Sequence, residues 1–338
     1  MADEAVQNEV TPEEPWERLQ ILSLDGGGFK GLFSAAVLAK LEEKSGNKVT
    51  DHFDLITGTS TGGLIAIGLG LGLSPREIVQ FYVKEGSTIF GNTCGWRWFL
   101  QWIGRKFPQH RLTAALKNDS AFGDKLLGQS NKRLVIPTYN LGQDQVRVFK
   151  TPHHPRLTTD RHIPAWKVAL ATSAAPTYFP ACQDINHMRL IDGGVWANNP
   201  AMVGVVEAVS MLGAALEAIK VFSIGTTDSR KPRRKALNWG GIFQWLRNKD
   251  VLDVLMRGQS VGVNGQVAHL IGPANYRRLD PIVPDGMYNL DSLTVEELLA
   301  EAEYVALHEV PFFRDQFCCH QARPFTPCFI TNGQGETR

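Results

Sequence analysis

Short apolar runs alternate with longer helix-like segments in the first part of the chain. Residues 19–24 and 53–57 have the length and the apolar character of buried strands. Each run is followed by a turn containing glycine and then by a helix-like segment, at residues 32–44 and 64–73. Strand–loop–helix units of this kind assemble into parallel sheets with right-handed crossovers and helices on both faces. The pattern therefore predicts an α/β fold, a three-layer α/β/α sandwich with a mostly parallel central sheet.

Further strands and helices follow from the same patterns. The remaining predicted strands are residues 132–138, 145–150, 189–191, 220–225 and 276–283, the first two as a hairpin pair. Ser74, Pro75 and Glu77 mark a helix start, with serine at the N-cap, proline at N1 and glutamate at N3. The remaining predicted helices are residues 163–175, 201–216, 238–246, 251–267 and a segment from a capping box at Thr294 and Glu297 to about His308.

The chain has 338 residues and no clear linker, so we expect one domain over residues 19–338. The motifs described below fall within residues 20–225, and residues 226–338 are C-terminal additions to this core. Tryptophans interleaved with arginine and lysine within residues 88–130 predict a helical cap insertion, or alternatively a lid or a membrane-interface patch. Residues 1–18 are acidic and polar, lack the pattern of a secretory signal, and predict a disordered tail.

Composition narrows the class of protein. A hydrophobic content of 43% and a charged content of 20% are those of a soluble globular protein, and a net charge of +1 argues against binding to a nucleic acid duplex. The five cysteines are odd in number and contain no Cys-x-x-Cys pair, which fits a reducing compartment. The longest apolar stretch, residues 64–73, is shorter than the roughly 20 residues that span a bilayer. We therefore expect a cytoplasmic protein.

The segment between the second predicted strand and its helix reads Gly-x-Ser-x-Gly, with Ser60 at its centre. This is the pattern of a nucleophile elbow, in which a serine occupies a sharp turn between a strand and a helix. Gly58 and Gly62 suit such a turn because it leaves no room for a Cβ atom beside the serine. We interpret Ser60 as a catalytic nucleophile that faces the positive end of the following helix dipole.

The first predicted strand leads into a second glycine-rich loop, residues 25–31, with the sequence Asp-Gly-Gly-Gly-Phe-Lys-Gly. Consecutive glycines between a strand and a helix expose backbone N–H groups that can converge on an anion. The loop matches the dinucleotide-binding fingerprint, and it also suits an oxyanion hole. The fingerprint requires an acidic residue at the end of the second strand, where Ser60 stands instead. The oxyanion hole is therefore the better supported use.

A third motif, Asp192-Gly193-Gly194, follows the short strand at residues 189–191. Asp-Gly pairs are common in turns, so this motif alone favours a plain turn. Its place at the end of a strand, however, allows Asp192 to face a serine on a neighbouring strand.

The three motifs in this order, with Asn198-Asn199-Pro200 behind the third, resemble the patatin-like phospholipase family. The resemblance implies a fold of patatin-like type, with Ser60 as nucleophile and Asp192 as its general base. It also implies an oxyanion hole formed by the amides of Gly26, Gly27 and Gly28. The supporting motif residues are Asp25, Lys30, Gly31, Gly58, Gly62, Gly193 and Gly194. The family often has arginine at the position of Lys30, so this chain keeps the charge but loses the fork geometry.

The implied activity is that of a lipid acyl hydrolase of phospholipase A type. Ser60 would attack an ester carbonyl of a membrane phospholipid while Asp192 takes its proton, and water would then hydrolyse the acyl-enzyme. Because a free carboxylate is a weak base, Asp192 needs a desolvated pocket or a neighbouring like charge that raises its pKa. We expect no metal and no cofactor, activity without calcium, and peripheral contact with the inner membrane surface.

The compact form of the chain, with no signal or anchor in its sequence, is similar to cyclic-dinucleotide-activated phospholipase effectors of bacterial anti-phage (CBASS) systems. This similarity implies a cyclic dinucleotide as activator, although no site for one can be read from the residues. The oligomeric state stays open, and a homo-oligomer is one of the alternatives.

Two other functions are compatible with the sequence. A Ser-His-Asp esterase of the α/β-hydrolase type shares Gly-x-Ser-x-Gly and needs a late histidine, for which His269, His308 and His320 are available. That reading leaves Asp192-Gly193-Gly194 unexplained. A non-catalytic nucleotide-binding protein would use the glycine-rich loop of residues 25–31 alone.

Overall fold

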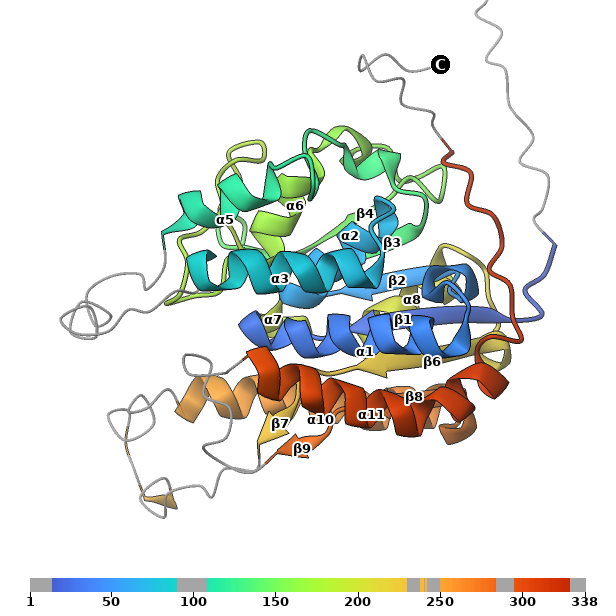
Figure 1. Cartoon of the computed structure of the whole chain (residues 1–338). Coiled ribbons are helices and arrows are strands. Elements are labelled where there is room, and N and C mark those ends of the chain that lie inside the picture. Colours follow the sequence, from blue (N-terminus) through green and yellow to red (C-terminus); the bar gives the residue numbers. More distant parts are fainter. Residues whose placement is uncertain are drawn as a thin grey trace, which may run out of the picture.

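A seven-stranded sheet organises the part of the chain that the computed structural model describes, which comprises residues 14–89, 108–229, 238–239, 241, 250–283 and 295–328. Its strands are β1 (Leu19–Leu24), β2 (Leu55–Gly58), β3 (Arg133–Asn140), β4 (Gln145–Lys150), β5 (Leu190–Asp192), β6 (Ile219–Ile224) and β8 (Tyr276–Leu279). The order across the sheet is β4–β3–β2–β1–β6–β8, and β5 also pairs with β3 (Figure 1). Strands β3, β2, β1, β6 and β8 are parallel to their neighbours in this order, whereas β4 and β5 run antiparallel to β3.

Helices cover both faces of this sheet (Figure 1). One face carries α1 (Gly31–Ser45), α2 (Thr61–Gly70), α3 (Pro75–Ile89), α5 (Gln109–Leu116), α6 (Ala165–Thr172) and α11 (Val295–Gln316). The other face carries α7 (Gly194–Ala197), α8 (Ala201–Ser210) and α10 (Asp250–Ile271). A separate parallel pair is formed by β7 (Asp228–Ser229) and β9 (Ile282–Val283). The predicted three-layer sandwich with a mostly parallel sheet is therefore confirmed.

Each face of the sheet has its own apolar core. Leu22 and Leu24 of β1 pack into the cluster beneath α1, α2 and α11, while Leu19 and Ile21 pack with α8 and α10. Successive strand residues point to opposite faces, so a strand covered on both sides needs apolar residues on both. This explains why β1 could be recognised from its nearly continuous apolar run.

Helix α11 is longer than the sequence predicted. The expected end was near His308, but the helix continues through Pro311 to Gln316. The added turns bring the buried rings of Phe313 and Phe317 against Phe53, at centroid distances of 6.3 and 5.9 Å. Burial of these rings stabilises the extension of the helix. It offsets the cost of Pro311, which removes one backbone hydrogen bond and whose ring clashes with the preceding turn.

Other helix ends follow local rules. The predicted cap of α3 is confirmed, because Glu77 N–H donates to Ser74 Oγ at 3.3 Å and Ser74 N–H donates to Glu77 Oε2 at 2.8 Å. Helix α8 ends at Ser210, before the predicted residue 216, because Gly213 adopts a left-handed φ of 66° and closes the helix.

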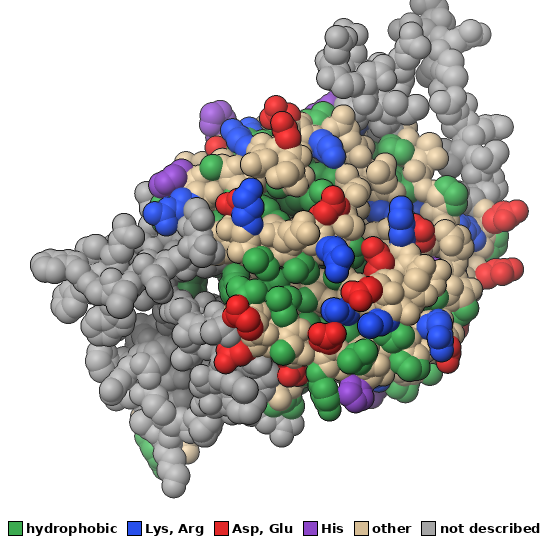
Figure 2. All heavy atoms as spheres, viewed as in Figure 1, with side chains coloured by type: hydrophobic (Ala, Val, Ile, Leu, Met, Phe, Trp, Pro, Cys, Tyr) green, Lys and Arg blue, Asp and Glu red, His purple; other side chains and the backbone are tan. Residues whose placement is uncertain are grey.

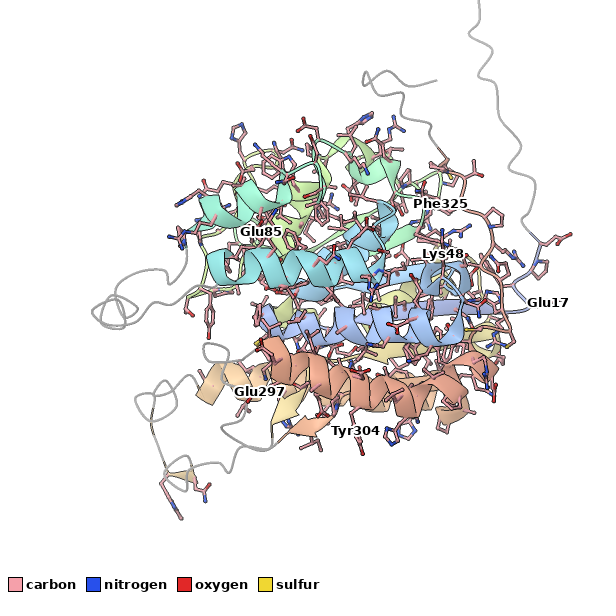
Figure 3. All side chains as sticks on the ribbon, viewed as in Figure 1. Glu17, Lys48, Glu85, Glu297, Tyr304 and Phe325 are labelled. Carbon is pink, nitrogen blue, oxygen red and sulfur yellow. The ribbon has the colours of Figure 1, made fainter. Side chains whose placement is uncertain are left out.

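The two ends of the described chain meet where the parallel strands begin. This side of the sheet is called the amino edge below, and the side where the parallel strands end is called the carboxyl edge. Trp16 is buried and its Nε1 donates to the carbonyl of Leu212 at 2.7 Å, while the guanidinium of Arg323 lies 3.9 Å from the Trp16 ring centroid. Figure 3 shows Glu17 and Phe325 at this same end of the molecule. The prediction of a disordered tail over residues 1–18 is therefore wrong for residues 14–18, and residues 1–13 lie outside the described chain.

Asp54, just before β2, fastens the C-terminal segment to this edge. Its Oδ2 accepts from Gln20 N–H at 2.8 Å and from His320 Nε2 at 2.7 Å, and its Oδ1 accepts from Arg323 N–H at 2.7 Å. His320 thus has a structural contact, far along the chain from the glycine-rich motifs.

The predicted cap is described only in part. Residues 90–107, which include most of its tryptophans, lie outside the described residues, so a lid or membrane-interface patch stays a prediction, as does the division into one domain with insertions. Among the described helices, none is both long and apolar enough to cross a bilayer. On the face that shows α1, α3 and α11, acidic and basic side chains are interspersed over the described surface (Figure 2).

Candidate active site

Ser60 occupies the sharp turn between β2 and α2, as the sequence predicted. Its backbone angles are φ 55° and ψ −124°, a conformation that is strained for any residue with a side chain. The turn is held because Ser60 N–H donates to Thr172 Oγ1 at 3.0 Å and Leu64 N–H donates to Ser60 O at 3.0 Å. Ser60 is the N-cap of α2, so the positive end of that helix dipole lies at the serine.

Close approach of the backbone explains the glycines of this turn. A Cβ atom on Gly58 would lie 2.2 Å from the carbonyl oxygen of Gly62, and one on Gly62 would lie 2.2 Å from the carbonyl oxygen of Leu24. A Cβ atom on Gly31 would likewise lie 2.0 Å from Thr61 Oγ1. The carbonyl oxygens opposite Gly58 and Gly62 are backbone atoms that cannot yield at such distances, so the packing of β1, β2 and α2 requires glycine at these two positions.

Strand β5 brings Asp192 to Ser60. The β2 ladder on β3 ends at the pair Thr57–Val135, and β5 pairs with β3 further along, with Asp192 opposite Thr138. Because β5 is antiparallel to β3, its last residue lies beside the turn that follows β2. A Cβ atom on Gly193 would lie 2.3 Å from the carbonyl oxygen of Pro137, so the chain can turn here only with glycine.

The Asp192 carboxyl group is buried, and its residue is 4% exposed. Burial raises its pKa to about 6, although hydrogen bonds from the Ser60 side chain and from the Gly194 N–H lower it. The Gly194 N–H donates to Asp192 Oδ1 at 2.7 Å. The structure therefore brings the side chains of Ser60 and Asp192 together and gives the acid a pKa closer to neutrality.

The glycine-rich loop after β1 lies alongside this pair. A Cβ atom on Gly26 would lie 3.2 Å from Ser60 Cβ, and Gly28 has a left-handed φ of 59° that favours glycine. Gly26 N–H, however, already donates to the carbonyl of Asn198 at 3.0 Å. The prediction that the Gly26 amide belongs to an oxyanion hole is therefore wrong. Within the described chain, the N–H groups of Gly27 and Gly28 have no hydrogen-bond partner.

Partners from the C-terminal half of the chain hold this loop. Thr226 Oγ1 donates to Gly26 O at 3.1 Å, and Lys30 Nζ donates to Thr227 O at 3.4 Å. Asp25 forms an ion pair with Arg278. Burial raises the pKa of Asp25 to about 6, although the charge of Arg278 and its hydrogen bonds lower it.

The Asn198-Asn199-Pro200 segment is also part of the site. Asn198 Oδ1 is buried without a hydrogen-bond partner among the described residues, and a Cβ atom on Gly194 would lie 3.2 Å from it. Helix α10 holds the segment, because Asn199 Nδ2 donates to Asn264 Oδ1 at 2.8 Å and Asn198 Nδ2 donates to Ser260 Oγ at 3.3 Å. The sequence marked this segment only by resemblance and gave no sign of its partners on α10.

The three late histidines, His269, His308 and His320, make their contacts away from Ser60 and Asp192. His320 bonds to Asp54 at the amino edge of the sheet, His308 Nδ1 bonds to the carbonyl of Tyr304 in its own helix, and His269 lies in the last turn of α10. Within the described chain, none of the three forms a hydrogen bond with Ser60 or Asp192. This geometry gives no support to a Ser-His-Asp triad.

Comparison with known proteins agrees with the motifs. The model of the family described as patatin-like phospholipase matches residues 22–205. A protein of Pseudomonas aeruginosa named cGAMP-activated phospholipase is 32% identical over 276 residues, which are 81% of each chain. A protein of Escherichia coli with the same name is 30% identical over 349 residues, covering 91% of this chain and 95% of its own.

Among solved structures, VipD from Legionella pneumophila has a TM-score of 0.47 and 14% identity, over 89% of this chain and 67% of that one. The family match covers all three glycine motifs and both Ser60 and Asp192. It ends at residue 205, so β6, α10, β8 and α11 lie outside it. On the strength of the family match and of these two relatives, the chain belongs to the patatin-like phospholipase family.

Proposed function

We propose that the protein is a serine acyl hydrolase that cleaves ester bonds of membrane phospholipids with a Ser60–Asp192 dyad. The observation that carries this proposal is that Ser60, at its strained turn, lies beside the buried carboxyl group of Asp192 and lowers the pKa of that group. A desolvated carboxylate with a pKa of about 6 is a better base than an exposed one, yet it is still ionised at neutral pH.

In the first step, Ser60 Oγ forms a bond to the ester carbonyl carbon while its proton passes to Asp192. The carbonyl oxygen becomes an oxyanion, and the N–H groups of Gly27 and Gly28 are the donors that would stabilise it. The tetrahedral intermediate then collapses, the bond to the alcohol oxygen breaks, and Asp192 returns its proton to the leaving lysophospholipid.

In the second step, water attacks the acyl-enzyme. Asp192 takes a proton from that water as the new C–O bond forms, and the same N–H groups hold the second oxyanion. Collapse releases the fatty acid, and the proton returns from Asp192 to Ser60 Oγ. The two residues thus complete the cycle without a third catalytic side chain.

Fatty-acid release from phosphatidylglycerol and phosphatidylethanolamine vesicles tests this proposal. In the presence of cGAMP, wild type should release fatty acid and Ser60→Ala should not, with and without a calcium chelator. Ser173→Ala is the matched control. Ser173 is buried, as Ser60 is, but the Oγ of Ser173 has no hydrogen-bond partner among the described residues. Equal release by wild type and Ser60→Ala, or loss of release on chelation of calcium, would contradict the proposal.

We also propose that a cyclic dinucleotide activates the enzyme, which would act in the cytoplasm at the inner membrane surface. Two relatives at 30% and 32% identity that bear the name cGAMP-activated phospholipase support this. Release from the same vesicles should stay low until cGAMP is added and should rise with its concentration. Release that is already maximal without nucleotide, and unchanged by cGAMP, would refute the activation while leaving the hydrolase intact.

A further inference from the structure

A buried arginine from the C-terminal third of the chain reaches the loop beside Ser60. Arg278 lies on β8, opposite Ser223 of β6, and its side chain extends past β6 to Asp25, which directly precedes the glycines. Nη1 donates to Asp25 Oδ1 at 2.7 Å and Nη2 donates to Asp25 Oδ2 at 2.6 Å. The two groups therefore form a bidentate pair, which fixes the plane of the carboxylate as well as its position.

This pair is enclosed and braced on further sides. Only 12% of the Arg278 side chain and 3% of the Asp25 side chain are exposed. The guanidinium also donates to Ser223 Oγ and to Asp280 Oδ2, each at 2.8 Å. Because a buried ion pair contributes little net stability compared with well-packed apolar side chains, stability alone does not explain this arrangement.

We propose that Arg278 is a positioning residue for the oxyanion-hole loop and acts through Asp25. Asp25 N–H donates to Ile224 O at 3.0 Å and Gly26 O accepts from Thr226 Oγ1, so the backbone on both sides of this residue is already fixed. With its carboxylate fixed as well, Asp25 cannot rotate, and the N–H groups of Gly27 and Gly28 keep one direction. Donors held in this way stabilise a developing negative charge without reorganising during the reaction.

This inference rests on the proposed function and extends it beyond residues 22–205, where the family match ends. Its test compares two neighbouring arginines of β8. Arg277 also forms a bidentate pair, with Glu309 of α11 at 2.7 and 2.5 Å, but that pair does not contact the glycine loop. Arg277→Gln is therefore the matched control for Arg278→Gln.

Steady-state kinetics of fatty-acid release should separate the two variants. Arg278→Gln is expected to lower kcat about ten- to a hundredfold with KM changed less than about twofold, since a small misplacement of the donors acts on the transition state. Arg277→Gln should keep kcat within about twofold of wild type. Equal losses of kcat in both variants, or an unchanged kcat in Arg278→Gln, would overturn the proposal.

A double-mutant cycle with Asp25→Asn tests whether Arg278 acts through Asp25. If it does, Arg278→Gln should lower kcat by less than about twofold further in the Asp25→Asn background, because the contact is already lost. If the losses of kcat in Arg278→Gln and in Asp25→Asn multiply in the double mutant, Arg278 does not act through Asp25. Should Arg278→Gln not fold, Arg278→Lys replaces it, with an expected three- to tenfold loss because lysine keeps the charge without the fork; an unchanged kcat would again overturn the proposal.

The labelling rate of Ser60 by a fluorophosphonate separates a failure of this inference from a failure of the proposed function. In that reaction Ser60 Oγ bonds to phosphorus, fluoride leaves, and the serine proton passes to Asp192. If wild type releases no more fatty acid than Ser60→Ala in the presence of cGAMP, the lipase proposal fails. Slower labelling of Arg278→Gln than of Arg277→Gln would still support the positioning role, and equal rates would overturn it.

Discussion

Asp54 and Asp192 are both buried aspartates next to short strands, but they lie at opposite edges of the same sheet. At the amino edge, Asp54 accepts three hydrogen bonds, from Gln20, His320 and Arg323. At the carboxyl edge, Asp192 accepts one hydrogen bond from Gly194 and lies beside Ser60, and burial raises its pKa to about 6.

The difference teaches how one residue type can have two uses in one fold. A carboxylate whose two oxygens accept hydrogen bonds from three chain segments holds those segments together. A carboxylate with fewer donors in an apolar setting is destabilised as an anion, and it can therefore take up a proton from a neighbour. The contrast predicts opposite effects of the same Asp→Asn replacement at the two edges.

The largest effect is expected from Asp192→Asn. If Asp192 is the base, as proposed above, this change should lower kcat by about a thousandfold or more, because the amide cannot take the Ser60 proton. The same change should stabilise the fold at pH 7–8 by about 1–3 kcal/mol, since the native pKa of about 6 lies above the ordinary 3.8. This gain should disappear as pH falls through 6 toward 4, where the native carboxyl group is already protonated.

Kinetics and denaturant unfolding on the same preparation measure both effects of Asp192→Asn. A loss of activity together with a loss of stability would mean that Asp192 serves the fold, as Asp54 does.

The next largest effect is expected from Gly28→Ala. Its φ of 59° and its N–H group both belong to the candidate oxyanion loop, so a Cβ atom should shift the donor and lower kcat about a hundredfold. Gly46→Ala is the control, because Gly46 has a φ of 74° at the end of α1 and nothing within 4 Å of the added Cβ. Similar kcat losses in both variants would show that left-handed strain, and not the donor, is responsible.

Asp54→Asn should act on stability and not on chemistry. An amide offers one acceptor oxygen where three donors converge, so at least one of them loses its partner, at a cost of about 2 kcal/mol or about thirtyfold in the unfolding equilibrium. Urea unfolding measures this loss, and kcat per folded molecule should stay within about twofold. A large fall in kcat would mean that the amino edge is coupled to the site.

The smallest effect concerns pH. If ionised Asp192 is the base, kcat/KM should fall about tenfold for each unit below pH 6, so that activity at pH 5 is about a tenth of its plateau. Asp25 has a similar pKa of about 6 and is the competing explanation. The Asp25→Asn variant should keep this fall in kcat/KM below pH 6, with a lower plateau above it. If the fall shifts to another pH or disappears in that variant, it belongs to Asp25.

The sequence revealed those parts of the fold and of the site that depend on local pattern. Strands β1 and β2, the capped start of α3 and the β3–β4 hairpin follow from apolar runs and turn residues within a few positions. Ser60 and the glycines around it were identifiable because a tight turn demands particular residues at fixed spacing. Asp192 was recognised through its motif, and the structure places it against Ser60.

Contacts between distant residues gave no local signal. Asp25 and Arg278 are 253 positions apart, and Gly26 and Thr226 are 200 positions apart. The use of the Gly26 N–H by Asn198 was missed for the same reason, since a glycine run does not say which amide is already bonded. The length of α11 depends on aromatic packing against Phe53 rather than on its own sequence.

The order in which the strands and helices occur along the chain has a consequence for synthesis of the protein. The glycine loop and Ser60 are made early, whereas β8 and α11, which packs along α1, are made near the end. Leu298, Ala302 and Phe313 of α11 are fully buried, so a nascent chain that lacks them leaves one side of α1 uncovered. The contact of Arg278 with the glycine loop and the covering of α1 by α11 therefore form only after the strands that carry Ser60 and Asp192 have been made.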